Sequence, residues 1–230
     1  MLQRPRSATQ SSYNSDILTF MKTKQNHPSL PPFTIAMSGA AETGHCAPTA
    51  FENTVKLDTL IAQRGAILVT GATHGAPQWA AKAAKEAGGT VIGFSPAASA
   101  RHHIKTYHLP IDYHDLIVYT GFDYVGRNLI LTRAADAVIT ICGRIGTLNE
   151  YTVAFEEQTI QGVLVGSGGM ADDLEAIVEK SHRGRGKTVF ESDPESLLDQ
   201  VMEMIKEEKK DLAELQNSRT QLGNEDSDTI

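Results

Sequence analysis

The residues best suited to chemistry lie in the segment AVITICGRIGTLNEYTVAFEE, from Ala137 to Glu157. An apolar run is followed by a glycine-containing turn, Cys142 to Thr147, and then by the carboxylate of Glu150. Glycine permits positive φ angles and lets a backbone approach a ligand closely, and the N-terminus of a following helix offers free N–H groups to an anion. The segment therefore predicts an anion-binding loop with a carboxylate nearby.

Thr147 and Glu150 also match a purely structural pattern. The tetrapeptide TLNE is a T-x-x-E capping box, in which both side chains bind N–H groups of the first helical turn. This interpretation places a helix over Leu148–Gln158. On the local pattern alone capping is the favoured interpretation, and it does not exclude a catalytic role for Glu150.

Arg144 is the unexpected residue of this loop because it stands between Gly143 and Gly146. Its guanidinium could make a bidentate contact to a phosphate, for which the planar fork is well shaped. It could instead pair with a carboxylate and partly fill the site, or point into solvent. The first alternative would suit a larger or differently phosphorylated nucleotide. The sequence leaves the three alternatives open.

The segments that must position these residues alternate between strand-like and helix-like patterns. The expected strands are short continuous apolar runs such as Phe33–Gly39, and the last expected helix has Asp193 as N-cap and Pro194 as its first residue. This alternation predicts an α/β fold, a Rossmann-like doubly wound parallel sheet in a single domain. We assign the domain to residues 31–212 and predict disordered tails at residues 1–30 and 213–230.

Glycines follow four of the expected strands, in Met37–Gly44, Val69–Gly75, Thr140–Thr147 and Val165–Gly169. In a parallel sheet these turns meet at the carboxyl edge, where ligands bind. Each turn alone is explained as well by a tight connection, but several at one edge favour a ligand site. The loops match neither GxGxxG nor GxxxxGK[ST], so a standard dinucleotide fingerprint and a P-loop are both unsupported.

The overall composition narrows the class of protein further. The chain has 230 residues, a net charge of −7 and a pI of about 5.6, which makes a broad basic surface for nucleic acid a poor expectation. No apolar run reaches the roughly 20 residues of a membrane span. The two cysteines, Cys46 and Cys142, form no CxxC pair and no disulfide framework, which predicts a reducing cytoplasmic location.

The segment RNLILTRAADAVITICGRIGTLNE resembles the Lonely Guy (LOG) family of SLOG-type Rossmann-like proteins, whose hallmark is an arginine, a strand and PGGxGTxxE. The loops MSGAAETG and VTGATHG look like the first two phosphate-side turns of that family. The resemblance runs from about Phe33 to about Phe190. It is closest to an uncharacterised branch with GGRxGTxxE, and molybdenum-cofactor carrier proteins share this broader fold family.

The resemblance implies roles for individual residues. Arg127 and Glu150 match the catalytic arginine and glutamate of the family. Cys142 stands where the family has proline, Arg144 where it has the second glycine, and Asn128 where characterised members usually have lysine. The residues expected to bind the nucleotide or its phosphate are Gly39, Ala40, Gly71, Ala72, Thr73, Gly75, Asn128, Gly143, Arg144, Gly146 and Thr147.

The resemblance also implies an activity, the hydrolysis of the N-glycosidic bond of a nucleoside 5'-monophosphate by a phosphoribohydrolase. Glu150 would stabilise the positive charge on the ribose or activate a water, and Arg127 would act as an electrostatic clamp. The alternative is a non-catalytic protein that binds or carries a nucleotide or the molybdenum cofactor. The resemblance further implies a homodimer or larger homo-oligomer.

No cofactor or metal ion is expected. The older "lysine decarboxylase" label of the family is rejected because pyridoxal phosphate needs a Schiff-base lysine, and the strand-end loops contain none. The spacing of His102, His103, His108 and His114 matches no zinc signature, which favours solvated loop histidines.

Overall fold

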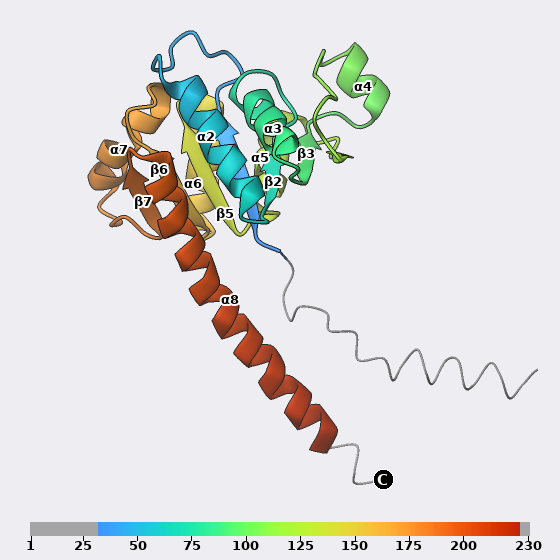
Figure 1. The fold of residues 1–230 in the computed structure, drawn as a ribbon, viewed down its shortest axis with the longest axis vertical. Coiled ribbons are helices and arrows are strands. Elements are labelled where there is room, and N and C mark those ends of the chain that lie inside the picture. The colour runs from blue at the N-terminus through green and yellow to red at the C-terminus, as the bar shows by residue number, and fades with distance from the viewer. Residues whose placement is uncertain (1–31, 226–230) are drawn as a thin grey trace, which may run out of the picture. The chain divides into compact units, whose positions relative to one another are not determined.

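The computed structural model describes residues 32–225 (Figure 1). The predicted tail at residues 1–30 and the last residues, 226–230, lie outside this range. Strands and helices alternate along the described chain, as predicted. The elements are β1 Thr34–Gly39, α2 Ala50–Gln63, β2 Ile67–Thr70, α3 Ala76–Glu86, β3 Val91–Ser95, α4 Ala100–Lys105, β4 Leu116–Tyr119, α5 Asp123–Arg133, β5 Ala137–Ile141, α6 Ile145–Glu156, β6 Ile160–Leu164, the 3₁₀ turn η1 Gly169–Asp172, α7 Leu174–Ser181, β7 Thr188–Glu191 and α8 Pro194–Glu225.

The strands form one seven-stranded parallel sheet in the order β4-β3-β2-β1-β5-β6-β7. From β1 the chain proceeds outward to β4, then crosses back to place β5 on the other side of β1. This reversal makes the sheet doubly wound, and the predicted Rossmann-like fold is confirmed. The carboxyl ends of β1 and β5 form the topological switch point, where such sheets leave a crevice.

Successive side chains of the strands alternate between two apolar layers, because neighbouring residues of a strand point to opposite faces. Ile35 and Met37 of β1 pack with α2, α3 and α8, which lie on the near side of the sheet in Figure 1. Ala36 packs with Leu131 of α5 and Ala154 of α6 on the opposite face. Burial on both faces explains why the strands read as continuous apolar runs.

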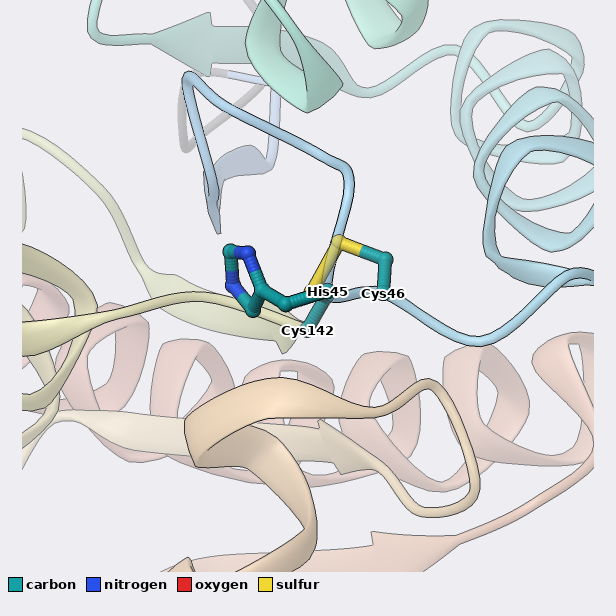
Figure 2. A group of neighbouring side chains, drawn as sticks. All are labelled: His45, Cys46 and Cys142. Carbon is teal, nitrogen blue, oxygen red and sulfur yellow. A yellow bond between two sulfur atoms is a disulfide. The ribbon is translucent and has the colours of Figure 1, made fainter.

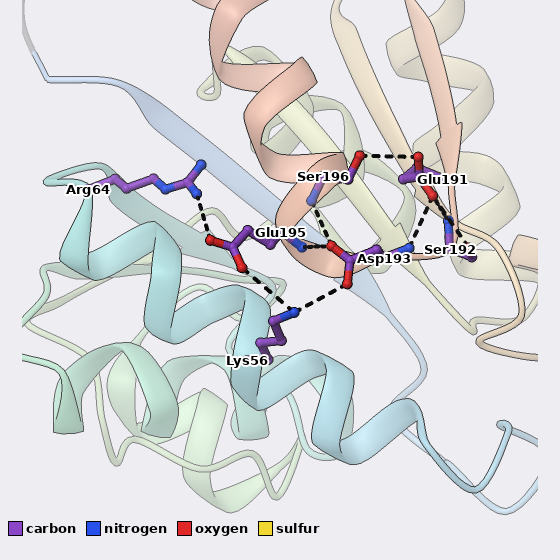
Figure 3. Close-up of polar contacts among 7 residues, drawn as sticks. All are labelled: Lys56, Arg64, Glu191, Ser192, Asp193, Glu195 and Ser196. Carbon is purple, nitrogen blue, oxygen red and sulfur yellow. Dashed lines mark hydrogen bonds and ion pairs between the residues drawn. The ribbon is translucent and has the colours of Figure 1, made fainter.

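The start of α8 is fixed by the predicted N-cap. Asp193 accepts hydrogen bonds from the backbone N–H groups of Glu195 (3.1 Å) and Ser196 (2.9 Å), and Pro194 is the first helical residue. Figure 3 shows Lys56 of α2 and Arg64, the residue after α2, reaching the same turn, with Lys56 3.2 Å from Asp193. These ion pairs are exposed and add little stability, so the apolar contacts of α8 with β6 and β7 hold it on the sheet.

Two expectations about the elements need correction. The stretch between β3 and β4, expected to be irregular, contains the short helix α4, whose N-cap Ser99 accepts a hydrogen bond from the backbone of His102. The helix α8 continues to Glu225, so residues 213–225 of the predicted disordered C-terminal tail are helical. No helix among residues 32–225 has both the length and the apolar character needed to cross a membrane.

Candidate active site

A cleft of about 580 Å³ opens at the carboxyl ends of β1 and β5, at the switch point of the sheet. Nine of the residues selected from the sequence line it, together with six others. The lining residues are Gly39, Ala40, Ala41, Glu42, Thr73, His74, Tyr107, Leu109, Tyr124, Arg127, Asn128, Arg144, Gly146, Thr147 and Glu150.

Glu150 presents a buried carboxylate to this cleft. It lies in the second turn of α6, is 8% exposed, and accepts a hydrogen bond from the hydroxyl of Ser38 in β1. Burial raises the pKa of Glu150 above its ordinary value, while the positive charge of Arg127 and the Ser38 hydroxyl oppose that rise. A carboxylate held in place and partly desolvated in this way is suited to stabilise a cation or to accept a proton.

Arg127 supplies the opposite charge from α5. Its side chain is 5% exposed, its Nη1 lies 3.4 Å from the carbonyl oxygen of Phe94, and its Nε has no hydrogen-bond partner among the described residues. Burial lowers the pKa of Arg127 and the charge of Glu150 raises it, although arginine remains a cation in proteins. Arg127 therefore carries a buried donor without a partner beside the cleft, which is unusual in a folded protein.

Gly71 makes room for this guanidinium. A Cβ atom at position 71 would lie 1.9 Å from Nη1 of Arg127, so any other residue would displace the guanidinium from this position. Gly71 does not line the cleft itself. Gly71 thus has a packing role, which brings Arg127 over the backbone at the end of β2, and its role in binding phosphate stays a prediction.

The first turn of α6 is the part of the loop that is predicted to bind an anion. The helix begins at Ile145 with Arg144 as N-cap, three residues earlier than predicted. Thr147 is thus inside the helix, no side chain caps its start, and Glu150 bonds to Ser38 instead. The capping-box interpretation is wrong. The free N–H groups of the first turn point outward from the helix start, as an anion site requires.

Gly143 shapes the turn that precedes this helix. Its φ is +94°, and a Cβ atom would lie within 2.5 Å of the Thr147 side chain. Gly143 does not line the cleft, and neither do Ala72 and Gly75. The N-terminus of α3 is already occupied, because Ala76 N–H donates to the carbonyl oxygen of Ala40 (2.9 Å). Of the N-termini of α3 and α6, only that of α6 is open to the cleft.

Arg144 pairs with a carboxylate, which was the second of the three alternatives. Its Nη1 lies 2.8 Å from Oε2 of Glu42 in the β1–α2 loop, and both side chains line the cleft. The pair is exposed, with 53% and 76% of the two side chains accessible. An exposed ion pair is easily exchanged for another partner, so Arg144 remains available to an anionic ligand.

Aromatic side chains form another wall of the cleft. Tyr107 and Tyr124 contact each other edge to face with ring centroids 5.6 Å apart, and Tyr124 lies 5.8 Å from the Arg127 guanidinium carbon. The Tyr107 hydroxyl donates to Asp123, and this hydrogen bond raises the pKa of Tyr107. A flat heterocycle could stack on such a wall.

Two histidines between β3 and β4 have structural roles. His103 is fully buried and binds Ser95 Oγ (2.8 Å) and the carbonyl oxygen of Pro110 (2.9 Å). His114 binds Thr70 Oγ1 (2.9 Å), and burial lowers its pKa. The expectation of solvated histidines is therefore wrong for these two. They fasten the segment that carries Tyr107 and Leu109 to the ends of β2 and β3.

The two cysteines form a disulfide. Cys46 in the β1–α2 loop and Cys142 at the end of β5 have Cα atoms 5.4 Å apart, although 96 positions separate them in the sequence. Two cysteines without a CxxC pair predicted no disulfide framework, and this bond corrects that expectation. The bond joins the two loops that flank the cleft.

The chain is similar to proteins of known sequence and known structure. A family model described as the SLOG cluster4 family matches residues 32–198. The chain belongs to this family. An uncharacterized protein from Archaeoglobus fulgidus is 29% identical over 119 residues, which is 52% of this chain and 73% of the relative.

Solved structures share the SLOG fold of this chain. The protein TM1055 is similar with a TM-score of 0.63 and 24% identity, over 75% of this chain and 99% of its own. The molybdenum cofactor binding protein from Rippkaea orientalis has a TM-score of 0.62 and 27% identity, over 76% and 99%. The molybdenum cofactor carrier protein MCP from Chlamydomonas reinhardtii has a TM-score of 0.60 and 23% identity, over 75% and 98%. The expected relation to such carriers is confirmed at the level of the fold.

Six residues that line the cleft were not selected from the sequence. Ala41 and Glu42 follow the selected Gly39 and Ala40 directly, and Tyr124 precedes Arg127 by one helical turn, so local spacing could have indicated all three. His74 lies in the second glycine loop, between the selected residues Thr73 and Gly75. Tyr107 and Leu109 carried no such signal, because only tertiary contacts bring their segment to the cleft.

Proposed function

We propose that the protein is a hydrolase that cleaves the bond between base and ribose in a nucleoside 5'-monophosphate. The observation that carries this proposal is the pair Glu150 and Ser38 beside Arg127 in the cleft. Cleavage of an N-glycosidic bond develops positive charge on the ribose, and a fixed, partly desolvated carboxylate stabilises that charge or activates the attacking water. A protein that only carries a ligand does not need such a carboxylate.

The cleft offers a place for each part of such a substrate. The first turn of α6, with Gly146 and Thr147, would bind the 5'-phosphate through backbone N–H groups, and Arg144 would add a charged contact. The base would stack on the wall formed by Tyr107 and Tyr124. This arrangement puts the ribose between the phosphate and the base, next to Glu150.

Asn128 differs from characterised LOG enzymes, which by the resemblance usually have lysine at this position. Its Nδ2 donates to Asn149 Oδ1 (2.9 Å), and its Oδ1 has no hydrogen-bond partner among the described residues. Because this position carries a neutral amide in place of a cation, we propose that Asn128 contributes to ligand binding through hydrogen bonding and not through charge.

A second candidate function is the binding and delivery of the molybdenum cofactor. The similarity to the molybdenum cofactor binding protein from Rippkaea orientalis supports it, since that similarity covers 99% of that protein at 27% identity. The same phosphate loop and aromatic wall would hold a phosphorylated pterin. In this case Glu150 would have no catalytic role.

One experiment separates the two functions. Purified protein is incubated with a panel of nucleoside 5'-monophosphates, and free base and ribose 5-phosphate are measured. The hydrolase proposal expects release from at least one member, and release must fall in the Glu150→Gln variant. Tight binding of a nucleotide without release rejects the hydrolase. A fluorescent oxidised pterin recovered from the purified protein, combined with no release, establishes the carrier.

The oligomeric state and the cytoplasmic location remain proposals. Large apolar side chains are exposed at the starts of α5 and α6, where Phe122 is 63%, Val125 74% and Ile145 74% accessible. Exposed apolar groups close together favour association, which supports the homodimer implied by the resemblance. Light scattering after gel filtration measures it directly, and a monomer at micromolar concentration would reject it.

A further inference from the structure

A group of three possible metal ligands lies outside the cleft, where its two flanking loops meet. His45 and Cys46 belong to the β1–α2 loop and Cys142 directly follows β5, and Figure 2 shows the imidazole beside the bond between the two sulfur atoms. One ligand atom from each residue lies within 4.8 Å of the other two. Two sulfur atoms and one imidazole nitrogen form a donor set that suits Zn²⁺.

The hydrogen bonds of His45 select the ring nitrogen that is free to bind a metal. Its Nε2 lies 3.1 Å from the carbonyl oxygen of Gly143, and because a carbonyl can only accept, Nε2 carries the proton. In the neutral ring Nδ1 then has a lone pair, and no described residue bonds to it. Zinc-bound histidines commonly donate their second N–H to a backbone carbonyl, which fixes the ring and raises its basicity.

The backbone around Cys142 is already held in place. Its N–H donates to Ser167 Oγ (2.8 Å), and its carbonyl oxygen accepts from Ala171 N–H (2.8 Å). Cys142 is fully buried, whereas Cys46 is half-buried and His45 is exposed. A cation would therefore enter from the side of His45, and a water would complete the tetrahedral set.

We propose that the reduced form of the protein binds one Zn²⁺ ion through Cys46, Cys142 and His45, and that the disulfide is the alternative, metal-free state of the same site. Binding breaks two S–H bonds, forms two Zn–S bonds and one Zn–N bond, and releases two protons. Formation of the disulfide from the two thiols releases two protons and two electrons, which a small-molecule disulfide takes up to become two thiols.

Either state ties together the loops that flank the cleft, whereas the reduced, metal-free protein lacks this link. Zn²⁺ should therefore raise the melting temperature of the reduced protein, because a ligand that binds only the folded form stabilises it. The oxidised protein has no thiolates to offer and should not respond. The inference does not depend on which of the two proposed functions is correct.

The test uses the full chain, reduced with a phosphine under anaerobic conditions and titrated with Cd²⁺ as a spectroscopic probe. We expect ultraviolet thiolate-to-metal absorption that saturates at one equivalent and is displaced by Zn²⁺. The oxidised protein should show no such absorption. Melting curves with and without Zn²⁺ give a second readout that needs no enzymatic activity.

Three variants complete the test. Cys46→Ser should abolish the absorption, and His45→Ala should weaken Cd²⁺ binding at least about tenfold, as expected for a lost ligand contact. His182→Asn, which alters an exposed histidine after α7, should leave it unchanged. The proposal is overturned if folded, reduced protein shows no thiolate absorption with Cd²⁺, or if His45→Ala and His182→Asn bind equally well.

Discussion

Glu150 on α6 and Asp58 on α2 are both buried carboxylates, with 8% and 0% of their surface exposed, and burial raises the pKa of each. Glu150 accepts a hydrogen bond from Ser38, feels the charge of Arg127 and lines the cleft. Both oxygens of Asp58 lack a hydrogen-bond partner among residues 32–225. A raised pKa therefore reports burial alone, and only the surrounding partners and an open cleft indicate chemistry.

The substitution of each carboxylate by its amide gives the largest expected contrast. Glu150→Gln should lower the rate of base release by about 10²- to 10⁴-fold, because it removes the charge that stabilises the ribose cation. Asp58→Asn should leave that rate unchanged. Steady-state kinetics with the best nucleotide and calorimetric binding to each variant measure the two effects. If both variants lose the same fraction of the rate of base release, the loss reflects damage to folding and not a catalytic role of Glu150.

The hydroxyl of Ser38 should matter next. It lowers the pKa of Glu150 by donating to the charged form, so Ser38→Ala should raise that pKa. Because activity needs the ionised carboxylate, it is lost as the pH falls through the pKa of Glu150, and this loss should begin at a higher pH in the variant. Below neutral pH we expect kcat/KM to be about 10- to 100-fold lower, the contribution of a hydrogen bond to a charged group.

The control for this experiment keeps the hydroxyl. Ser38→Thr should restore most of the wild-type profile of kcat/KM against pH. If the fall of kcat/KM at low pH occurs at the same pH in Ser38→Ala as in the wild type, the ionisation of another group limits the rate.

Asp58 should affect stability instead of activity. Its folded-state pKa is raised above the ordinary 3.8, so the folded protein keeps a proton that the unfolded chain has lost. The free energy of unfolding should therefore fall as the pH rises from the ordinary value to the folded-state pKa. Asp58→Asn should remove this loss and stabilise the protein at pH 8 by about 1 to 3 kcal/mol.

Urea denaturation at pH 4 and pH 8 measures the stability of wild type and variant. The gain from Asp58→Asn should shrink toward low pH, where the carboxyl group of the wild type is neutral. A gain that is equal at both values, or absent at pH 8, would show that Asp58 is ionised and paired in solution.

The exposed pair of Arg144 and Glu42 should give the smallest effect on stability. Arg144→Gly should change the free energy of unfolding by less than about 1 kcal/mol, since solvent screens such pairs. If the guanidinium moves to the ligand phosphate, the same change weakens nucleotide binding, more strongly at low salt. Glu42→Gln should then strengthen binding, because it frees Arg144. If both variants bind the nucleotide with unchanged affinity, the ion pair has no role in ligand binding.

The carboxylate comparison also explains how far the site could be predicted. Arg127 and Glu150 were selected through the resemblance, and both line the cleft. The capping-box pattern favoured a structural role for Glu150. The T-x-x-E pattern does not show where the helix begins, and α6 begins before Thr147. Ser38, which distinguishes Glu150 from Asp58, lies 112 positions away. No local pattern could indicate that contact.

The sequence by itself determined the alternation of strands and helices, the parallel sheet, and the glycine turns at one edge. These features depend on residues within a few positions of each other, through side-chain periodicity, caps and the conformational freedom of glycine. The tertiary structure alone decided that Cys46 meets Cys142, that Arg144 meets Glu42 and that Tyr107 faces the cleft. Each of these contacts requires the strand order that places β5 beside β1, and strand order is a property of the whole sheet.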